Sequence, residues 1–325
     1  MRRSAARTSI AALAGLSLLL TACGTTAGST PSGSGSGGIE VVTSTNVYGD
    51  VVQAIGGDKV SVRAIITKTS QDPHSYEANA QDKLLISKAD LVIENGGGYD
   101  GFIQKMADDS NIPHSNVISA VEASGLAPEE AQSDAGSTGA AGGHERTHGG
   151  FNEHVWYSVD VMSRLADAVA AKLGALDPDA ASTFTANAAA FKTGLQEISG
   201  KLSAIKVAHG RAPVAITEPV PLYLLEAAGL ENKTPAEYSA AIEEGTDVPP
   251  AVLKAATELA GSAELSFLAY NEQTAGPQTE AVRKAAESAG VPVVNFSETL
   301  PDGKTYLQWM TDNVENIGNA LENNR

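Results

Sequence analysis

The sequence predicts an α/β fold with two lobes, each built on a mainly parallel sheet, joined by one long helix. Short apolar runs alternate with helical patterns over residues 39–123 and again over 212–323, as strands and crossover helices do in parallel sheets. Between these regions an apolar stripe continues at steps of three and four residues from Phe184 to Ile205. Such a stripe predicts a helix that contacts both lobes along its length.

In the N-terminal half, strands are expected at 39–45, 60–67, 90–96 and within 115–123. The segments between them carry helical patterns, which predict helices at 46–57, 80–89 and 101–109. Residues 125–150 are rich in Gly, Ser and Ala and predict a flexible loop, after which a helix is expected over 153–176.

The long helix is expected over 178–206, because Asp177 can cap it and Pro178 suits the first helical position. The C-terminal half then predicts strands at 212–217, 265–271 and 291–296. Its expected helices are 220–231, 249–262, 278–290 and 306–323. The predicted organisation is therefore an N-terminal lobe over 39–177, the linking helix over 178–206, and a C-terminal lobe over 207–325.

The first residues have the features of an export signal. Three arginines precede an apolar run over 10–20, which is too short to span a bilayer as a mature helix. The sequence Leu-Thr-Ala-Cys that ends at Cys23 resembles a bacterial lipobox, so we expect a signal peptide over 1–22 and a lipid on Cys23. The Gly/Ser-rich segment 23–38 predicts a flexible tether. The protein is therefore expected on the extracytoplasmic face of the bacterial cell membrane, anchored by lipid.

The composition narrows the classes of partner and of covalent structure. The formal net charge of −17 makes nucleic acid an unfavourable partner. Cys23 is the only cysteine, so no disulfide can form within one chain. No second apolar stretch has the length of a transmembrane helix.

His144 and His148 form an H-E-x-x-H sequence, the zinc signature of metalloproteases. That chemistry needs both histidines on one face of a helix, and the glycines on each side of the motif disfavour a helix. The alternatives are a solvated loop in which the spacing is accidental, and a flexible loop that binds metal weakly for a better site elsewhere.

Four other residues, most of them at strand ends, could form a stronger metal site. His74 follows the strand 60–67, Glu218 follows 212–217, and Glu298 follows 291–296. His154 precedes the helix expected after the loop. Ligands of open α/β sheets sit beyond the carboxyl ends of strands, and two neutral imidazoles with two carboxylates balance a divalent cation. The separation between the two histidines equals that between the two glutamates, so each lobe would supply two ligands.

From residue 39 onward the chain resembles the metal-binding receptors of bacterial zinc and manganese ABC importers. The resemblance is carried by the lipobox, "DPHSYE", "HVW" after a histidine-bearing loop, the long helix, "TE" at a strand end, and "SETL" before a terminal helix with a Tyr. It implies a metal held between two lobes by His74, His154, Glu218 and Glu298, with Glu272 beside the site. It also implies a monomeric receptor, without enzymatic activity, that delivers the metal to a permease and its ATPase.

Some residues depart from the pattern of that family, and they bear on the choice of metal. Asn152-Glu153 stands where the family usually has Asp-Pro, and Glu298 stands where Asp is more common. A glutamate as third ligand is typical of manganese carriers, whereas a loop with histidines such as His144 and His148 is typical of zinc carriers. We expect Zn²⁺, with Mn²⁺ as the alternative.

Two other functions remain open from the residues alone. A zinc metallohydrolase would need an open coordination position and a general base, for which Glu153 and Glu272 are the candidates. An adhesin role is also compatible with a protein anchored at the cell surface.

Deletion of residues 136–149 is predicted to leave the high-affinity metal site intact and to remove only weaker, secondary binding. The reason is that this segment carries neither a helical pattern nor an apolar face. Calorimetric titration of the deleted and full-length proteins measures both classes of site. Loss of the tight site on deletion would instead show that His144 or His148 is a primary ligand.

Overall fold

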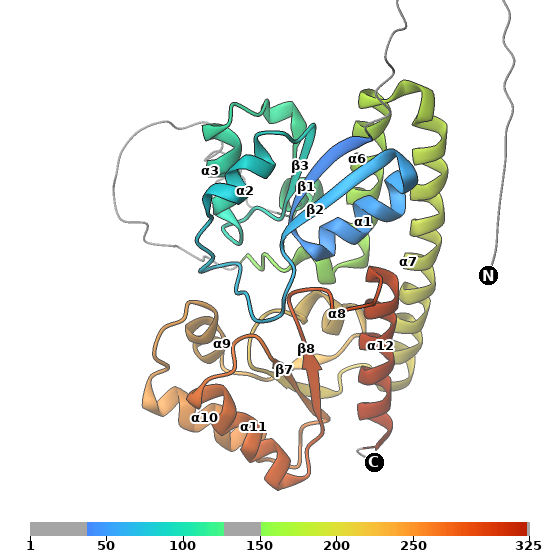
Figure 1. The fold of residues 1–325 in the computed structure, drawn as a ribbon. Helices are drawn as coiled ribbons and strands as arrows, with labels where there is room; N and C mark the ends of the chain where they lie inside the picture. The colour runs from blue at the N-terminus through green and yellow to red at the C-terminus, as the bar shows by residue number, and fades with distance from the viewer. Residues whose placement is uncertain (1–37, 127–150, 324–325) are drawn as a thin grey trace, which may run out of the picture. The chain divides into compact units, whose positions relative to one another are not determined.

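The computed structural model describes residues 38–126 and 151–323 (Figure 1). The expected signal peptide, Cys23, the tether, His144 and His148 lie outside these residues. The part described contains two four-stranded sheets, and all paired strands within each sheet are parallel. The predicted α/β class with parallel sheets is therefore confirmed.

The two sheets have the same strand order. The N-terminal sheet follows the order β2-β1-β3-β4, from β1 (Ile39–Thr45), β2 (Val60–Ile66), β3 (Leu91–Glu94) and β4 (Val117–Ser119). The C-terminal sheet follows the order β6-β5-β7-β8, from β5 (Pro213–Ile216), β6 (Glu231–Asn232), β7 (Phe267–Asn271) and β8 (Val293–Phe296). In each sheet the first strand of the lobe lies between the second and the third, so corresponding strand ends occupy corresponding places.

Helices connect the strands on both sides of each sheet. Those of the N-terminal lobe are α1 (Asn46–Gly56), α2 (Ala80–Ile86), α3 (Gly101–Asp109), α4 (Ala120–Ser124) and α6 (Val159–Leu176). Those of the C-terminal lobe are α8 (Leu222–Ala227), α9 (Ala236–Glu243), α10 (Pro250–Ala260), α11 (Pro277–Ala289) and α12 (Tyr306–Asn323). Short 3₁₀ turns are η1 (Gly57–Lys59), η2 (His114–Asn116), η4 (Val155–Tyr157) and η5 (Pro178–Ala180).

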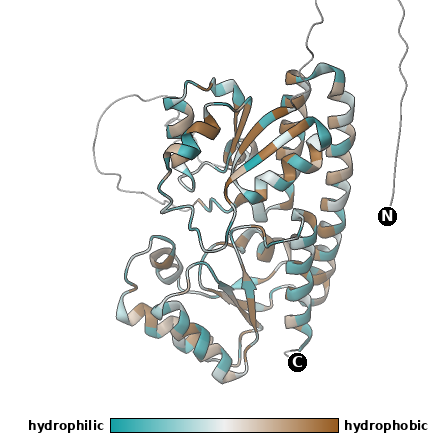
Figure 2. Cartoon of the chain, viewed as in Figure 1, coloured by the Kyte–Doolittle hydropathy of each residue, from teal (hydrophilic) through white to brown (hydrophobic). Residues whose placement is uncertain are grey.

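One central strand of each sheet is buried along its whole length. Every residue of β3 and of β7 is buried, as expected of parallel strands with both faces covered. Figure 2 shows the strands of the N-terminal sheet mostly in brown, the hydrophobic end of the scale. In the residues described, none of the helices combines the length and the apolar character that crossing a membrane requires.

Three local features differ from the sequence-based expectations. The helix expected over 153–176 is divided into η4 and α6, and His154 precedes both. Ser158 accepts a hydrogen bond from the backbone of Val161 and so caps α6. Strand β6 and helix α9 were not predicted, since β6 has only two residues and no apolar run marks it.

The long helix α7 (Ala181–His209) follows the η5 turn that begins at Pro178. Its buried residues are Phe184, Ala188, Phe191, Leu195, Ile198 and Leu202, the predicted stripe. It packs against α1 and α6 of the N-terminal lobe and against α8 and α12 of the C-terminal lobe (Figure 1). A side chain at Gly194 would lie 2.6 Å from Leu307 of α12, so this glycine permits close helix packing there.

Hydrogen bonds between the lobes add to the contacts of α7. Asn46, directly after β1, exchanges two bonds with the backbone of Leu300, at 2.8 and 2.9 Å. The hydroxyl of Tyr157 donates to the carbonyl of Ser297 at 2.7 Å, and that of Tyr306 donates to the carbonyl of Trp156 at 2.6 Å. These bonds are buried or partly buried, and opening the lobes would break them without compensation from another protein group.

Metal binding is predicted to rotate the lobes by only a few degrees, with most rearrangement in the loops near His154, Glu218 and Glu298. Wide closure needs residues that absorb large φ and ψ changes, and bending α7 would expose its buried stripe. Small-angle scattering of apo and metal-loaded protein should give nearly equal radii of gyration. A clear decrease on loading would contradict this prediction.

Candidate metal centre

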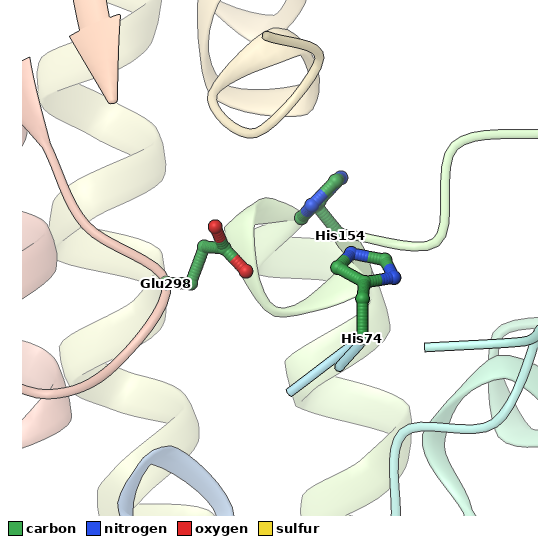
Figure 3. A group of neighbouring side chains, drawn as sticks. All are labelled: His74, His154 and Glu298. Atoms are coloured by element: carbon green, nitrogen blue, oxygen red, sulfur yellow. The ribbon is translucent and has the colours of Figure 1, made fainter. Parts of the chain in front are cut away.

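His74, His154 and Glu298 come together from three separate segments of the chain. His74 lies in the loop between β2 and α2, His154 lies just before η4, and Glu298 follows β8. One potential ligand atom from each residue lies within 4.8 Å of those of the other two. Figure 3 shows the carboxylate of Glu298 directed toward the two imidazole rings.

His154 is positioned by the residue two places before it. The backbone N–H of His154 donates to Oδ1 of Asn152 at 3.1 Å, which identifies that atom as the amide oxygen. The ring atom Nδ1 lies 2.7 Å from the same oxygen and therefore carries the proton. Burial, with a smaller contribution from His74, holds the pKa of His154 well below its usual range. The result is a neutral imidazole whose Nε2 has a free lone pair, the form that binds metals.

Glu298 is a buried carboxylate with donors on both oxygens. The hydroxyl of Tyr99 donates to Oε2 at 3.1 Å, and Nδ2 of Asn271 donates to Oε1 at 2.8 Å. Its side chain is nonetheless so deeply buried that desolvation, and then the charge of Glu218, raises its pKa to about 8. A cation at this place would favour the ionised form.

Glu218, the fourth ligand expected from the sequence, accepts hydrogen bonds from residues of its own lobe. Its carboxylate accepts hydrogen bonds from Nδ2 of Asn271 and, at 2.7 Å, from the hydroxyl of Thr274. Burial raises its pKa to about 7 despite these bonds. Among the described residues, Glu218 belongs to neither group of side chains whose ligand atoms lie within 4.8 Å of one another. It is linked to Glu298 through the shared donor Asn271.

Two carboxylates that sequence reasoning did not assign as ligands approach the histidines. Oε1 of Glu243 lies 3.6 Å from Nε2 of His154 and 3.8 Å from Nε2 of His74. Oε1 of Glu153 lies 4.0 Å from Nδ1 of His74. Burial, followed by the charges of neighbouring carboxylates with Glu153 first among them, raises the pKa of Glu243 to about 10. Glu243 was not identified from the sequence because β6 and α9 were not predicted. It follows the second strand of its lobe, as His74 does.

A pocket borders the centre where Glu153 and Glu243 lie. It is lined by Phe151, Asn152, Glu153, Pro219 and Leu222, and across from them by Ser239, Ala240, Glu243 and Glu244. Glu153 and Glu243 are thus the site carboxylates that border the pocket. Glu272, the rival strand-end carboxylate, is exposed and accepts a hydrogen bond at 2.6 Å from Asn295.

Comparisons with known proteins find relatives that match most of the chain. The manganese-binding lipoprotein MntA of Halalkalibacterium halodurans is 24% identical over 87% of this chain and 89% of its own length. The manganese ABC transporter substrate-binding lipoprotein scaA of Streptococcus gordonii is 22% identical over 93% of this chain and 94% of its own. The periplasmic zinc binding protein TroA from Treponema pallidum matches in structure with a TM-score of 0.68 at 22% identity, over 88% of this chain and 99% of its own.

A protein-family model also matches most of the folded region. The model of the family described as zinc-uptake complex component A, periplasmic (ZnuA) covers residues 41–320. That range includes α7, every residue of the candidate centre and, apart from Ile39 and Glu40, both sheets. The chain therefore belongs to the ZnuA family.

Proposed function

We propose that this protein is the extracytoplasmic receptor of an ABC importer, and that it binds a divalent transition metal between its lobes and delivers it to a permease driven by an ATPase. The observation that carries the proposal is the convergence of two histidines of one lobe with a buried carboxylate of the other. A lipid on Cys23 would hold the receptor at the membrane surface as a monomer. No reaction is catalysed.

The chemistry of the centre supports a cation as the ligand. The neutral, oriented imidazole of His154 offers a nitrogen lone pair, and the carboxylates of Glu218, Glu243 and Glu298 are costly to ionise without a counter-charge. A divalent metal offsets that cost in a way that a neutral solute would not. His74, His154 and Glu298 are therefore the proposed core ligands, and Glu218 is the fourth residue of the set expected from the sequence.

Zinc is the proposed metal, and manganese is the alternative. Two imidazoles with carboxylates form a ligand set that suits zinc, while manganese prefers oxygen ligands. The curated relatives described above are named for manganese, and the structural relative TroA is named for zinc. Since most N/O sites bind zinc more tightly than manganese, affinity alone does not identify the physiological metal, and metal content must be measured.

The protein isolated without chelator is predicted to contain about one equivalent of zinc, measured by mass spectrometry with metal quantification. Removal of the metal should lower the melting temperature, and re-addition of zinc should restore it. Zinc at a thousandfold excess over its dissociation constant would stabilise the fold by about 4 kcal/mol. No bound metal, together with no thermal shift by zinc or manganese, would contradict the proposed function.

The changes His74→Ala, His154→Ala, Glu218→Ala and Glu298→Ala are each predicted to weaken metal binding by well over tenfold, because each removes a donor atom of the expected ligand set. Glu272→Ala is the matched control, since this carboxylate follows the neighbouring strand but is exposed. Calorimetry gives the affinities, and circular dichroism verifies that the apo-variants are folded. Parent-like binding by Glu298→Ala, with loss of binding by Glu272→Ala, would show that the wrong strand-end carboxylate was chosen.

A further inference from the structure

We propose that Gln273 is a positioning residue of the metal centre, which joins the loop of Glu298 in the C-terminal lobe to the loop of His74 in the N-terminal lobe. The inference rests on the proposed metal-binding function and leaves the expected ligand set as it stands. Gln273 lies in the turn that follows β7. Its amide acts through hydrogen bonds that fix the backbone on both sides of the site, and it does not bind the ion.

The oxygen of the Gln273 side chain holds the backbone of the Glu298 loop. Oε1 accepts hydrogen bonds from the N–H groups of Glu298, at 2.5 Å, and of Thr299, at 3.1 Å. Both of these residues are buried, and a buried N–H group needs an acceptor within the protein. Because two consecutive N–H groups point at one oxygen, this segment cannot turn without breaking one of the bonds. Gln273 therefore fixes the place from which the carboxylate of Glu298 extends.

The nitrogen of the same side chain reaches the other lobe. The two backbone donors identify Oε1 as the amide oxygen, so Nε2 is the donor group. Nε2 of Gln273 donates to the carbonyl of Gln71 at 3.4 Å. Gln71 lies in the loop between β2 and α2 that also carries His74. One planar amide therefore contacts a metal-binding loop of each lobe.

The loop of His74 can transmit this contact because it is held by its own hydrogen bonds. Oε1 of Gln71 accepts from the backbone N–H groups of Thr67 and Lys68, at 3.2 and 3.3 Å. The next residue, Asp72, accepts at Oδ1 from the backbone N–H of His74 at 2.9 Å. The carbonyl to which the amide nitrogen donates belongs to the peptide group between Gln71 and Asp72. A movement of that peptide group would therefore displace His74.

The turn that carries Gln273 is itself attached to an interior strand of the C-terminal sheet. The backbone N–H of Gln273 donates at 3.1 Å to Oδ1 of Asn271, the buried last residue of β7. The N–H of Asn271 donates to the hydroxyl of Thr217 at 2.9 Å, and its Nδ2 donates to Oε1 of Glu298 at 2.8 Å. Asn271 thus orients the carboxylate of Glu298, while Gln273 holds its backbone.

This arrangement bears on metal binding because the donor atoms come from different lobes. Loops are in general more mobile than the strands they follow, and a binding site requires its ligands to be held within about 0.5 Å of the productive geometry. Without the Gln273 amide, His74 and Glu298 would remain as ligands but would vary more in their relative positions. Zinc should then bind less tightly and leave faster.

The test compares Gln273→Met with Gln278→Met in the full chain, since methionine has a similar length but no amide. Gln278 is the matched control, because it also bonds the N–H and the carbonyl of one backbone residue, Val248, at 3.2 and 3.5 Å. Neither Gln278 nor Val248 belongs to the candidate centre. Calorimetry should show a loss of about tenfold in zinc affinity for Gln273→Met, as is typical when a partner around a metal site is removed. A chelator should also remove zinc faster in stopped-flow measurements, and Gln278→Met should match the parent in both.

Hydrogen exchange verifies that each change removes the intended bond. The N–H groups of Glu298 and Thr299 should exchange faster in Gln273→Met, and that of Val248 should exchange faster in Gln278→Met. Thermal unfolding of the apo-variants shows whether each is folded. Gln273→Asn, which keeps the amide but is shorter by one methylene, is a second variant that should also release zinc faster.

A merely structural role for Gln273 predicts a different result. Its removal would lower the melting temperature of the apo-protein but leave the affinity and the release rate of zinc as in the parent. That result, or an equal effect of Gln278→Met on zinc release, would overturn the proposal. Absence of zinc binding by the parent would contradict the proposed function instead.

Discussion

The structure depends on one electrostatic constraint, the burial of several carboxylates in a small space between two lobes. Glu218, Glu243 and Glu298 are largely withdrawn from water, and desolvation is the largest cause of the raised pKa of each. In a medium of low polarity these groups cannot all be ionised without a nearby positive charge. Burial keeps His154 neutral, so that imidazole does not supply the positive charge. The arrangement is thus complementary to a cation.

This complementarity to a cation requires that the two lobes keep their relative positions. Helix α7 packs against both lobes, and the bonds of Asn46, Tyr157 and Tyr306 cross between them. If the lobes separated easily, water would enter and solvate the carboxylates, and the preference for a cation would fall. Of the three proposed core ligands, His74 is the least constrained by packing, since it lies in a loop and its side chain is 15% exposed. One bond ties that loop to the other lobe, from Nε2 of Gln273 to the carbonyl of Gln71.

Much of this architecture could be predicted from the sequence, and there is a physical reason why the other features could not. Apolar runs and periodic stripes are visible locally, so the parallel strands and the stripe of α7 could be predicted. His74, His154 and Glu298 could be proposed because they are polar residues at the ends of such runs. Glu243 could not be recognised as a residue near the site, because β6 has two residues and α9 follows it without a clear pattern. Glu218 follows the same strand-end rule, and its assignment as a ligand stays a prediction.

The hydrogen bonds of the carboxylates also bear on which metal the frame favours. Both oxygens of Glu298 already accept hydrogen bonds, from Tyr99 and Asn271, which leaves it suited to bind through a single oxygen. If two carboxylates each give one oxygen and two histidines each give one nitrogen, as proposed, the protein would supply four donors. In the proposed site, four donors would complete the tetrahedral shell of zinc, whereas manganese prefers a larger number of oxygen ligands. Selectivity in such a centre arises from the number of donors that the frame presents, since affinity alone favours zinc in almost any site of this kind.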